Sequence, residues 1–366
     1  MSSFKTDGLI FLALALVGIG LCWVVPSITV QIFTLFIMIV LAMTWDTCGG
    51  QMGYNSLGNI FFFGVGMYAC VVVQVWVKYD VREWNSPYGD LGIVEFTQNE
   101  YLMGLGLGLI AAAIIPVICA ALLGLIFFSL RGPYFAIGTL AMALAAIEIF
   151  TAWEFVGGGQ GMSVPDFKFE SPDTKNLMFM YLAVVLSAMT FFFLRWLYST
   201  RFGLSINAIR DDEDKAEAMG FRTTRIKIIA WCTSAFFLGI AGALFGNIAN
   251  FVEPKDPAFP TVTFGVFMVA MALLGGKGTI WGPVLGAILF QIIKEVTWTY
   301  LLGWQWVALG SIIIINVVFF QQGILGWARD RWPNFFGIEI EENLTRDVSG
   351  DAPEIDVGQS VDGEVS

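Results

Sequence analysis

The 366-residue sequence contains no histidine, and only 13% of its residues are charged. A soluble globular domain carries about 25% charged residues, so this deficit argues against a soluble protein. Without histidine, the chain lacks the commonest transition-metal ligand and the commonest general base. The five cysteines show no CxxC pairing and lie in apolar segments, where we expect them to act as small buried hydrophobic groups.

A nucleotide-binding loop is also missing. The segment Gly275-Gly276-Lys277-Gly278 holds a glycine–lysine pair, but Met271 and Gly278 stand where a P-loop needs a glycine and a hydroxyl residue. No HExxH, GxSxG or metal-spaced cluster occurs. We therefore expect no cofactor in this chain. The net charge of −11 argues against nucleic acid as a partner.

What the sequence does contain is long apolar runs without charge, which indicate membrane spans. A spanning helix needs about 20 mostly apolar residues. We expect an all-α integral membrane protein with about ten transmembrane helices. The predicted spans are Leu9–Val25, Ile28–Trp45, Ile60–Val77, Gly104–Leu130, Tyr134–Trp153, Leu177–Leu197, Ile226–Phe251, Thr261–Leu274, Val284–Leu301 and Trp306–Phe320.

Positive charge in short loops sets the orientation of such a chain. The loop Ser199–Lys227 holds six basic residues: Arg201, Arg210, Lys215, Arg222, Arg225 and Lys227. We therefore place this loop and both termini in the cytoplasm, and loops 78–100 and 154–175 outside. Residues 1–326 form the predicted transmembrane domain. Residues 327–366 form an acidic cytoplasmic tail that we expect to be disordered.

Glycines interrupt two of the apolar regions. Four lie between Gly49 and Gly58, and another group lies at 157–161. Irregular backbone at membrane depth is tolerated only against protein or a water-filled cavity, and broken helices often line a solute path. We assign 49–58 to such a path, although close helix packing explains the same glycines. Glu148 and Glu295 lie within predicted spans, where a charge is a functional candidate by default.

The charged loop contains a predicted short helix, Asp211–Met219. Asp211 is its expected N-cap, acids crowd its first turn, and Gly220 is expected to end it. Four successive acids, 211–214, disfavour an anionic lipid surface. Docking of a soluble partner is therefore the favoured interpretation, and a solvated connector is the alternative.

Four segments carry a family pattern in fixed order. They are Gly50-Gln51-Met52-Gly53-Tyr54-Asn55-Ser56-Leu57-Gly58, then Gly132-Pro133-Tyr134-Phe135-Ala136, then Ala208-Ile209-Arg210 through Gly220, and Gly275-Gly276-Lys277-Gly278 followed by Gly282-Pro283. Together they resemble the permease subunits of branched-chain amino acid ABC importers over residues 50–287. The resemblance implies a type II importer-like fold in a prokaryotic cell membrane, with broken or re-entrant segments.

The resemblance also implies partners. They are a second related permease, two cytoplasmic ATPase subunits that bind ATP, and an extracytoplasmic solute-binding protein. It assigns ATPase coupling to Arg210, Asp211, Glu213, Ala216, Glu217, Ala218 and Gly220. The predicted solute path comprises Gly50, Gly53, Ser56, Gly58, Gly158 and Gly161. No catalytic residue is expected, because the ATP-hydrolysing chains are separate.

The solute and the energy source stay open at this point. Val156 stands where the family often has threonine, so urea and short amides remain alternatives to branched-chain amino acids. An ion-coupled secondary transporter or channel that uses Glu148 or Glu295 is the competing function. A membrane scaffold that recruits a cytoplasmic protein through the loop is a third.

Overall fold

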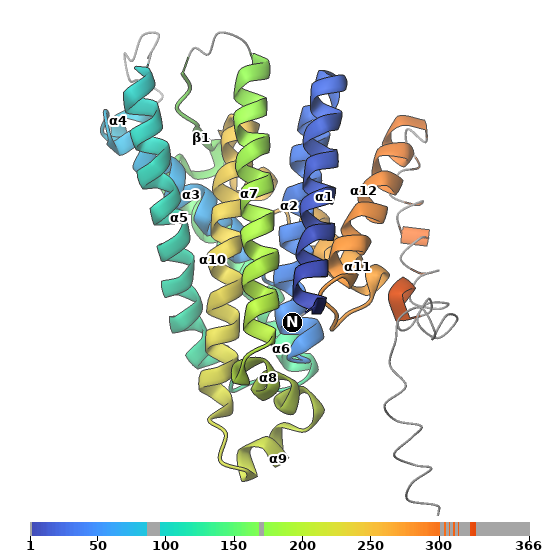
Figure 1. Cartoon of the computed structure of the whole chain (residues 1–366). Coiled ribbons are helices and arrows are strands. Elements are labelled where there is room, and N and C mark those ends of the chain that lie inside the picture. Colours follow the sequence, from blue (N-terminus) through green and yellow to red (C-terminus); the bar gives the residue numbers. More distant parts are fainter. Residues whose placement is uncertain are drawn as a thin grey trace, which may run out of the picture.

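The computed structural model describes residues 2–85, 96–167 and 172–300, together with 304, 307, 310–311, 314 and 323–326. These residues form a bundle of long helices (Figure 1). The helices are α1 (Ser2–Val24), α2 (Thr29–Asp46), α3 (Ile60–Trp76), α4 (Val81–Trp84), α5 (Gln98–Phe127), α6 (Pro133–Ala152), α7 (Pro172–Tyr198), α8 (Arg201–Asp211), α9 (Glu213–Ala218), α10 (Thr223–Ala249), α11 (Val266–Gly275) and α12 (Gly282–Tyr300).

Seven helical stretches in the described residues are long and apolar enough to cross a membrane, and Ile60–Trp76 is a shorter apolar one. Helices suit these sequences because every backbone group is then bonded within its own segment. Nine of the ten predicted spans fall on helices of the structure, and the tenth, Trp306–Phe320, lies largely outside the described residues. The predicted total of about ten therefore remains a prediction. The predicted tail, 327–366, also lies outside the described residues.

Helices α10 and α2 make most of the contacts in the bundle, and they also contact each other. Helix α10 packs against α3 and α5, and α2 packs against α7, α11 and α12. Glycines permit the closest of these approaches, because a Cβ at Gly66 would overlap the backbone of Gly239, and one at Gly242 would overlap the carbonyl oxygen of Phe63. Small residues allow membrane helices to approach in this way.

The two ends of the bundle differ. Helices α8 and α9 project from one end, here called the α9 end (Figure 1). The opposite end, the β1 end, carries α4 and a two-stranded antiparallel sheet of β1 (Met162–Ser163) and β2 (Phe251–Val252). Short helical turns interrupt the long helices: η1 (Pro26–Ile28), η2 (Thr47–Gln51), η3 (Glu154–Val156), η4 (Gly158–Gln160), η5 (Pro254–Ala258) and η6 (Thr261–Gly265).

Candidate functional site

The charged loop folds as two helices rather than the single helix predicted over Asp211–Met219. Helix α8 includes Asp211 as its last residue, and the backbone becomes extended at Asp212 (φ −162°, ψ 105°) before α9 begins. The N-cap of α9 is therefore Asp212, not Asp211: its carboxylate accepts a hydrogen bond from the backbone N–H of Lys215 at 3.0 Å. This bond is the largest cause of the lowered pKa of Asp212. Several adjacent acids in the sequence could serve as the N-cap. The extended backbone at Asp212, between α8 and α9, determines which one does.

Gly220 ends α9, as predicted. Its φ of +90° lies in the left-handed region, where glycine carries no Cβ penalty. The N–H of Phe221 donates to the carbonyl of Ala216 at 3.1 Å, and the N–H of Gly220 donates to that of Glu217 at 2.9 Å. These two bonds make a Schellman motif, which satisfies the last carbonyls of the helix. Both ends of this six-residue helix are therefore fixed by local bonds.

A buried charge pair holds α9 against the bundle. The ammonium of Lys227, in the first part of α10, is only 1% exposed and lies 2.7 Å from a Glu213 carboxylate oxygen. It also donates to the hydroxyl of Tyr54 at 3.0 Å and to the carbonyl of Phe128 at 3.4 Å. The Tyr54 hydroxyl donates in turn to the other oxygen of Glu213. Three segments far apart in the sequence thus meet at one ammonium group.

The environment of Glu213 favours its ionised form. Partial burial raises the pKa of this carboxyl, but the hydrogen bonds from Lys227 and Tyr54 and the charge of Lys227 outweigh that effect. The net shift of its pKa is downward. The ring of Tyr54 adds a cation–π contact, with its centroid 4.6 Å from the Lys227 ammonium. The ionised carboxylate of Glu213 is therefore favoured beside the Lys227 ammonium.

The predicted coupling residues separate into two sets. Glu213 and Ala216 face the bundle, and Ala216 is fully buried. The exposed members of the predicted set are Arg210, Asp211, Glu217, Ala218 and Gly220. Beside them, the exposed side chain of Met219 adds an apolar group. One face of α9 is thus available to another molecule, and the other face is fixed to this chain.

Arg131 ties α9 to the connection between α5 and α6. Its guanidinium lies 2.7 Å from Asp214 and 3.9 Å from Glu217. All three side chains are more than half exposed, so the pairs add little stability by themselves. They do place the α9 surface beside the start of α6.

The predicted solute-path residues near the α9 end lie in close packing. A Cβ at Gly50 would overlap the carboxylate of Asp46, and one at Gly58 would overlap the backbone of Thr139 in α6. Gly53 (φ +79°) faces Arg210, whose Cγ would lie 3.1 Å from an added Cβ. These contacts favour the packing explanation for the three glycines. Their place on a solute path stays a prediction.

Asp46 and Trp45 fix the interrupted region after α2. The carboxylate of Asp46, 2% exposed, accepts a hydrogen bond from the backbone N–H of Gly278 at 2.7 Å. The indole N–H of Trp45 donates to the carbonyl of Ser56 at 2.7 Å. The buried hydroxyl of Ser56 has no hydrogen-bond partner among the described residues. The break after α2 is therefore an ordered structure, held by residues distant in sequence.

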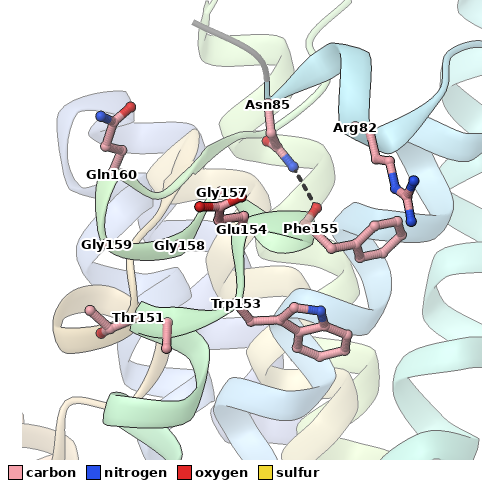
Figure 2. A pocket seen from close by; sticks show the side chains of 11 residues that line it. Arg82, Asn85, Thr151, Trp153, Glu154, Phe155, Gly157, Gly158, Gly159 and Gln160 are labelled. Carbon is pink, nitrogen blue, oxygen red and sulfur yellow. Dashed lines mark hydrogen bonds between the residues drawn. The ribbon is translucent and has the colours of Figure 1, made fainter.

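The other two predicted path residues lie at the β1 end. Gly158 lines a cavity of about 1060 Å³ between the α4 side and the turn after α6. Figure 2 shows Arg82, Trp153, Glu154 and Gln160 around this cavity, with Asn85 donating to the carbonyl of Phe155 at 2.8 Å. Gly161 does not line the cavity: it packs against the ring of Phe251 in β2.

Sequence reasoning did not find Lys227, Tyr54 or Asp46 as members of the site. The sequence indicates Lys227 only as one of the basic residues that set the membrane topology. A signal existed for Asp46, because it is the single charged residue between two long charge-free runs, 8–45 and 47–77. No pattern indicated its partner, Gly278, which lies 232 residues further along the chain.

Comparison with known proteins identifies the family to which the chain belongs. The family model for the permease component of branched-chain amino acid transport systems matches residues 27–320. The LivM permease of the high-affinity branched-chain amino acid transport system of Salmonella typhimurium is 25% identical over 348 residues, covering 88% of this chain and 75% of LivM. LivM of Escherichia coli K12 is 27% identical with the same coverage.

More distant relatives carry other names. The fructose import permease FrcC of Rhizobium meliloti is 26% identical and covers 60% of this chain and 61% of its own length. No solved structure matches the chain significantly. The family match extends over most of the described helices, including α8 and α9. The chain therefore belongs to the family of permease components of branched-chain amino acid transport systems, as a multi-pass membrane protein.

Proposed function

We propose that this chain is the membrane-spanning subunit of an ATP-driven importer that moves branched-chain amino acids by alternating access. The observation that carries the proposal is the short helix α9, which exposes one face and is anchored by its other face to Lys227 and Tyr54. A partner that binds the exposed face can move such a helix, and the anchored face transmits this movement to the bundle. The names of the LivM relatives support the amino acid substrate.

In this proposal, the α9 end faces the cytoplasm, as the basic residues of the loop predict. Two ATPase subunits bind and hydrolyse ATP, and this chain binds none. Closure of the ATPases moves α9, and three contacts carry that motion onward. Two start in α9: Glu213 pairs with Lys227 in α10, and Asp214 pairs with Arg131 in the α5–α6 connection. The third starts in the adjoining α8, where Arg210 lies against the interrupted region at Gly53.

The remaining partners are a second related permease and an extracytoplasmic binding protein that delivers the solute. The cavity lined by Gly158 at the β1 end is a suitable place for that delivery, because it is open and lined by both charged and aromatic residues. The fructose permease among the relatives leaves a neutral solute as the alternative within the same family.

The test is reconstituted uptake. This chain is expressed with the proposed ATPases, second permease and binding protein, and the complex is placed in liposomes that contain ATP. We expect uptake of L-leucine that requires ATP, the ATPases and the binding protein. A Walker-lysine variant of the ATPases is the control and abolishes uptake. Uptake driven by an ion gradient without ATP refutes the proposal and supports the ion-coupled transporter.

A further inference from the structure

A second cavity of about 630 Å³ lies between α6 and the η5–η6 segment. Helix α6 contributes one wall, and the turns after β2 contribute the other. The lining residues are Leu144, Ala145, Ile147, Glu148, Lys255, Asp256, Phe259, Pro260, Thr261 and Thr263. None of the predicted solute-path residues belongs to this groove, so it was not found from the sequence.

The groove contains charged groups of both signs. Glu148 is exposed on an otherwise apolar face of α6, one turn before the helix ends at Ala152. Lys255 and Asp256 are exposed on the facing segment. Within the part of the chain that the structure describes, neither Glu148 nor Lys255 lies within 4.0 Å of an oppositely charged group. Unpaired charges within an apolar helix bundle require a partner or water.

Apart from Thr261 and Thr263, the other lining residues of the groove are apolar. Leu144 and Ile147 line the α6 side, and Phe259 lines the other. The Phe259 ring is fully buried and lies 5.0 Å from the ring of Phe150 and 6.2 Å from that of Tyr68, centroid to centroid. This aromatic cluster fixes one wall. The groove therefore combines a firm apolar surface with one cation and two carboxylates.

We propose that this groove binds the transported solute, and that it selects a zwitterionic α-amino acid with an aliphatic side chain. Glu148 receives the ammonium group, Lys255 receives the carboxylate, and Leu144 and Ile147 contact the side chain. The assignment rests on the proposed function, because it takes the groove to be a stage of the transport path.

The chemistry of the groove discriminates between solutes. A neutral sugar leaves Glu148 and Lys255 without charged partners, and site groups that lose their partners disfavour the ligand. A zwitterion pairs both charges and still buries apolar surface.

The place of the groove suits a solute that enters from the β1 end. Thr151 and Ala152 line the cavity at that end, and Glu148 lines the groove one turn further along the same helix. The two cavities therefore follow each other along α6. A solute delivered to the first reaches Glu148 next.

The test measures binding to the full membrane complex in lipid nanodiscs without the binding protein. Three probes are compared: L-leucine, isoamylamine, which lacks the carboxylate, and 4-methylpentanoate, which lacks the ammonium. We expect Glu148→Gln to weaken binding of L-leucine and isoamylamine about tenfold to a hundredfold, as expected for hydrogen bonds to charged groups, and to leave 4-methylpentanoate unchanged. Lys255→Met should weaken L-leucine and 4-methylpentanoate, and spare isoamylamine.

Asp173→Asn is the matched control, because it removes an exposed carboxylate near the β1 end that does not line the groove. ATPase activity stimulated by the loaded binding protein confirms that each variant is folded and assembled. Equal weakening of all three probes by both variants overturns the proposal, as does unchanged L-leucine binding. Tighter binding of L-arginine or a neutral sugar than of L-leucine overturns it as well.

The two proposals fail separately. ATP-driven uptake with no charge-selective effect of Glu148→Gln refutes only the groove. Ion-driven uptake with the charge-selective effect intact refutes only the ATP-driven importer. Each outcome is read from a different assay, uptake in liposomes and binding in nanodiscs.

Discussion

Replacing Glu213 by glutamine should release α9 from the bundle. The change leaves Lys227, 1% exposed, without its carboxylate partner. Removing one member of a buried ion pair costs about 3–5 kcal/mol, because the other charge stays buried and uncompensated. The contacts that remain, from Tyr54 and the Phe128 carbonyl, place the loss at the lower end, about 3 kcal/mol.

That loss should appear as local opening of the loop rather than global unfolding, because the pair joins α9 to α10 and not the long helices to one another. Hydrogen exchange of the α9 amides, measured by mass spectrometry on the whole complex, reports it. We expect exchange roughly a hundredfold faster in Glu213→Gln. ATP hydrolysed per L-leucine imported should rise in the same variant.

The controls separate charge from shape. Asp214→Asn removes a 77% exposed carboxylate of the same helix. It should change the free energy of local opening of α9 by less than about 1 kcal/mol. The double variant Glu213→Gln with Lys227→Met removes both charges and should recover most of the protection, since apolar replacement of a buried pair is often neutral. Unchanged exchange of the α9 amides in Glu213→Gln refutes the anchoring role of the ion pair. Faster exchange in the double variant than in either single variant refutes it as well.

Three further predictions concern α9 and the packing of two glycines. Glu217→Lys and Gly220→Val should leave the protein inserted but uncouple ATP hydrolysis from uptake. The first reverses an exposed charge, and the second places a branched residue at φ +90°, where even an unbranched side chain costs about 1–2 kcal/mol. Normal uptake by both variants contradicts the coupling role. Gly58→Val should lower the yield of folded protein in size-exclusion chromatography because its side chain overlaps the Thr139 backbone, whereas Gly106→Ala, with open space around it, should not. Because the pKa of Glu213 is lowered, the docked loop binds fewer protons than the released loop. Docking should therefore be stable above the free glutamate pKa of about 4.3 and be lost as the pH falls below it. Fast hydrogen exchange of the α9 amides at about pH 5 or above, which indicates a released loop, contradicts this.

The long helices could be predicted from the sequence because their signal is local. A charge-free run of about 20 residues has few folded alternatives in a bilayer, so nine of the ten predicted spans coincide with helices. Their C-terminal ends agree to within three residues, and their starts differ by up to seven. The end of α9 was also predictable, since Gly220 follows directly from the backbone conformation that a helix terminus needs.

The contacts that hold the candidate site together are not local, and they could not be predicted. Tyr54 and Lys227 are 173 residues apart, and no periodicity connects them. The choice of Asp212 over Asp211 as N-cap depends on where the Glu213–Lys227 pair places the start of α9, which is a tertiary constraint. Glu148 was noticed as a charge in a span, but its facing residues, Lys255 and Asp256, come from a turn whose position depends on the packing of α3 and α6.

The hydrogen bond from Gly278 to Asp46 also has a consequence for biosynthesis. During translation, α2 enters the membrane long before its partner exists, because 232 residues separate donor and acceptor. At about 5–20 residues per second, the ribosome needs roughly 12–46 s to reach Gly278. Throughout that interval the Asp46 carboxylate lacks its hydrogen bond from Gly278, so the contacts at the end of α2 are incomplete. The end of α2 can therefore be completed only after α11 has been synthesised.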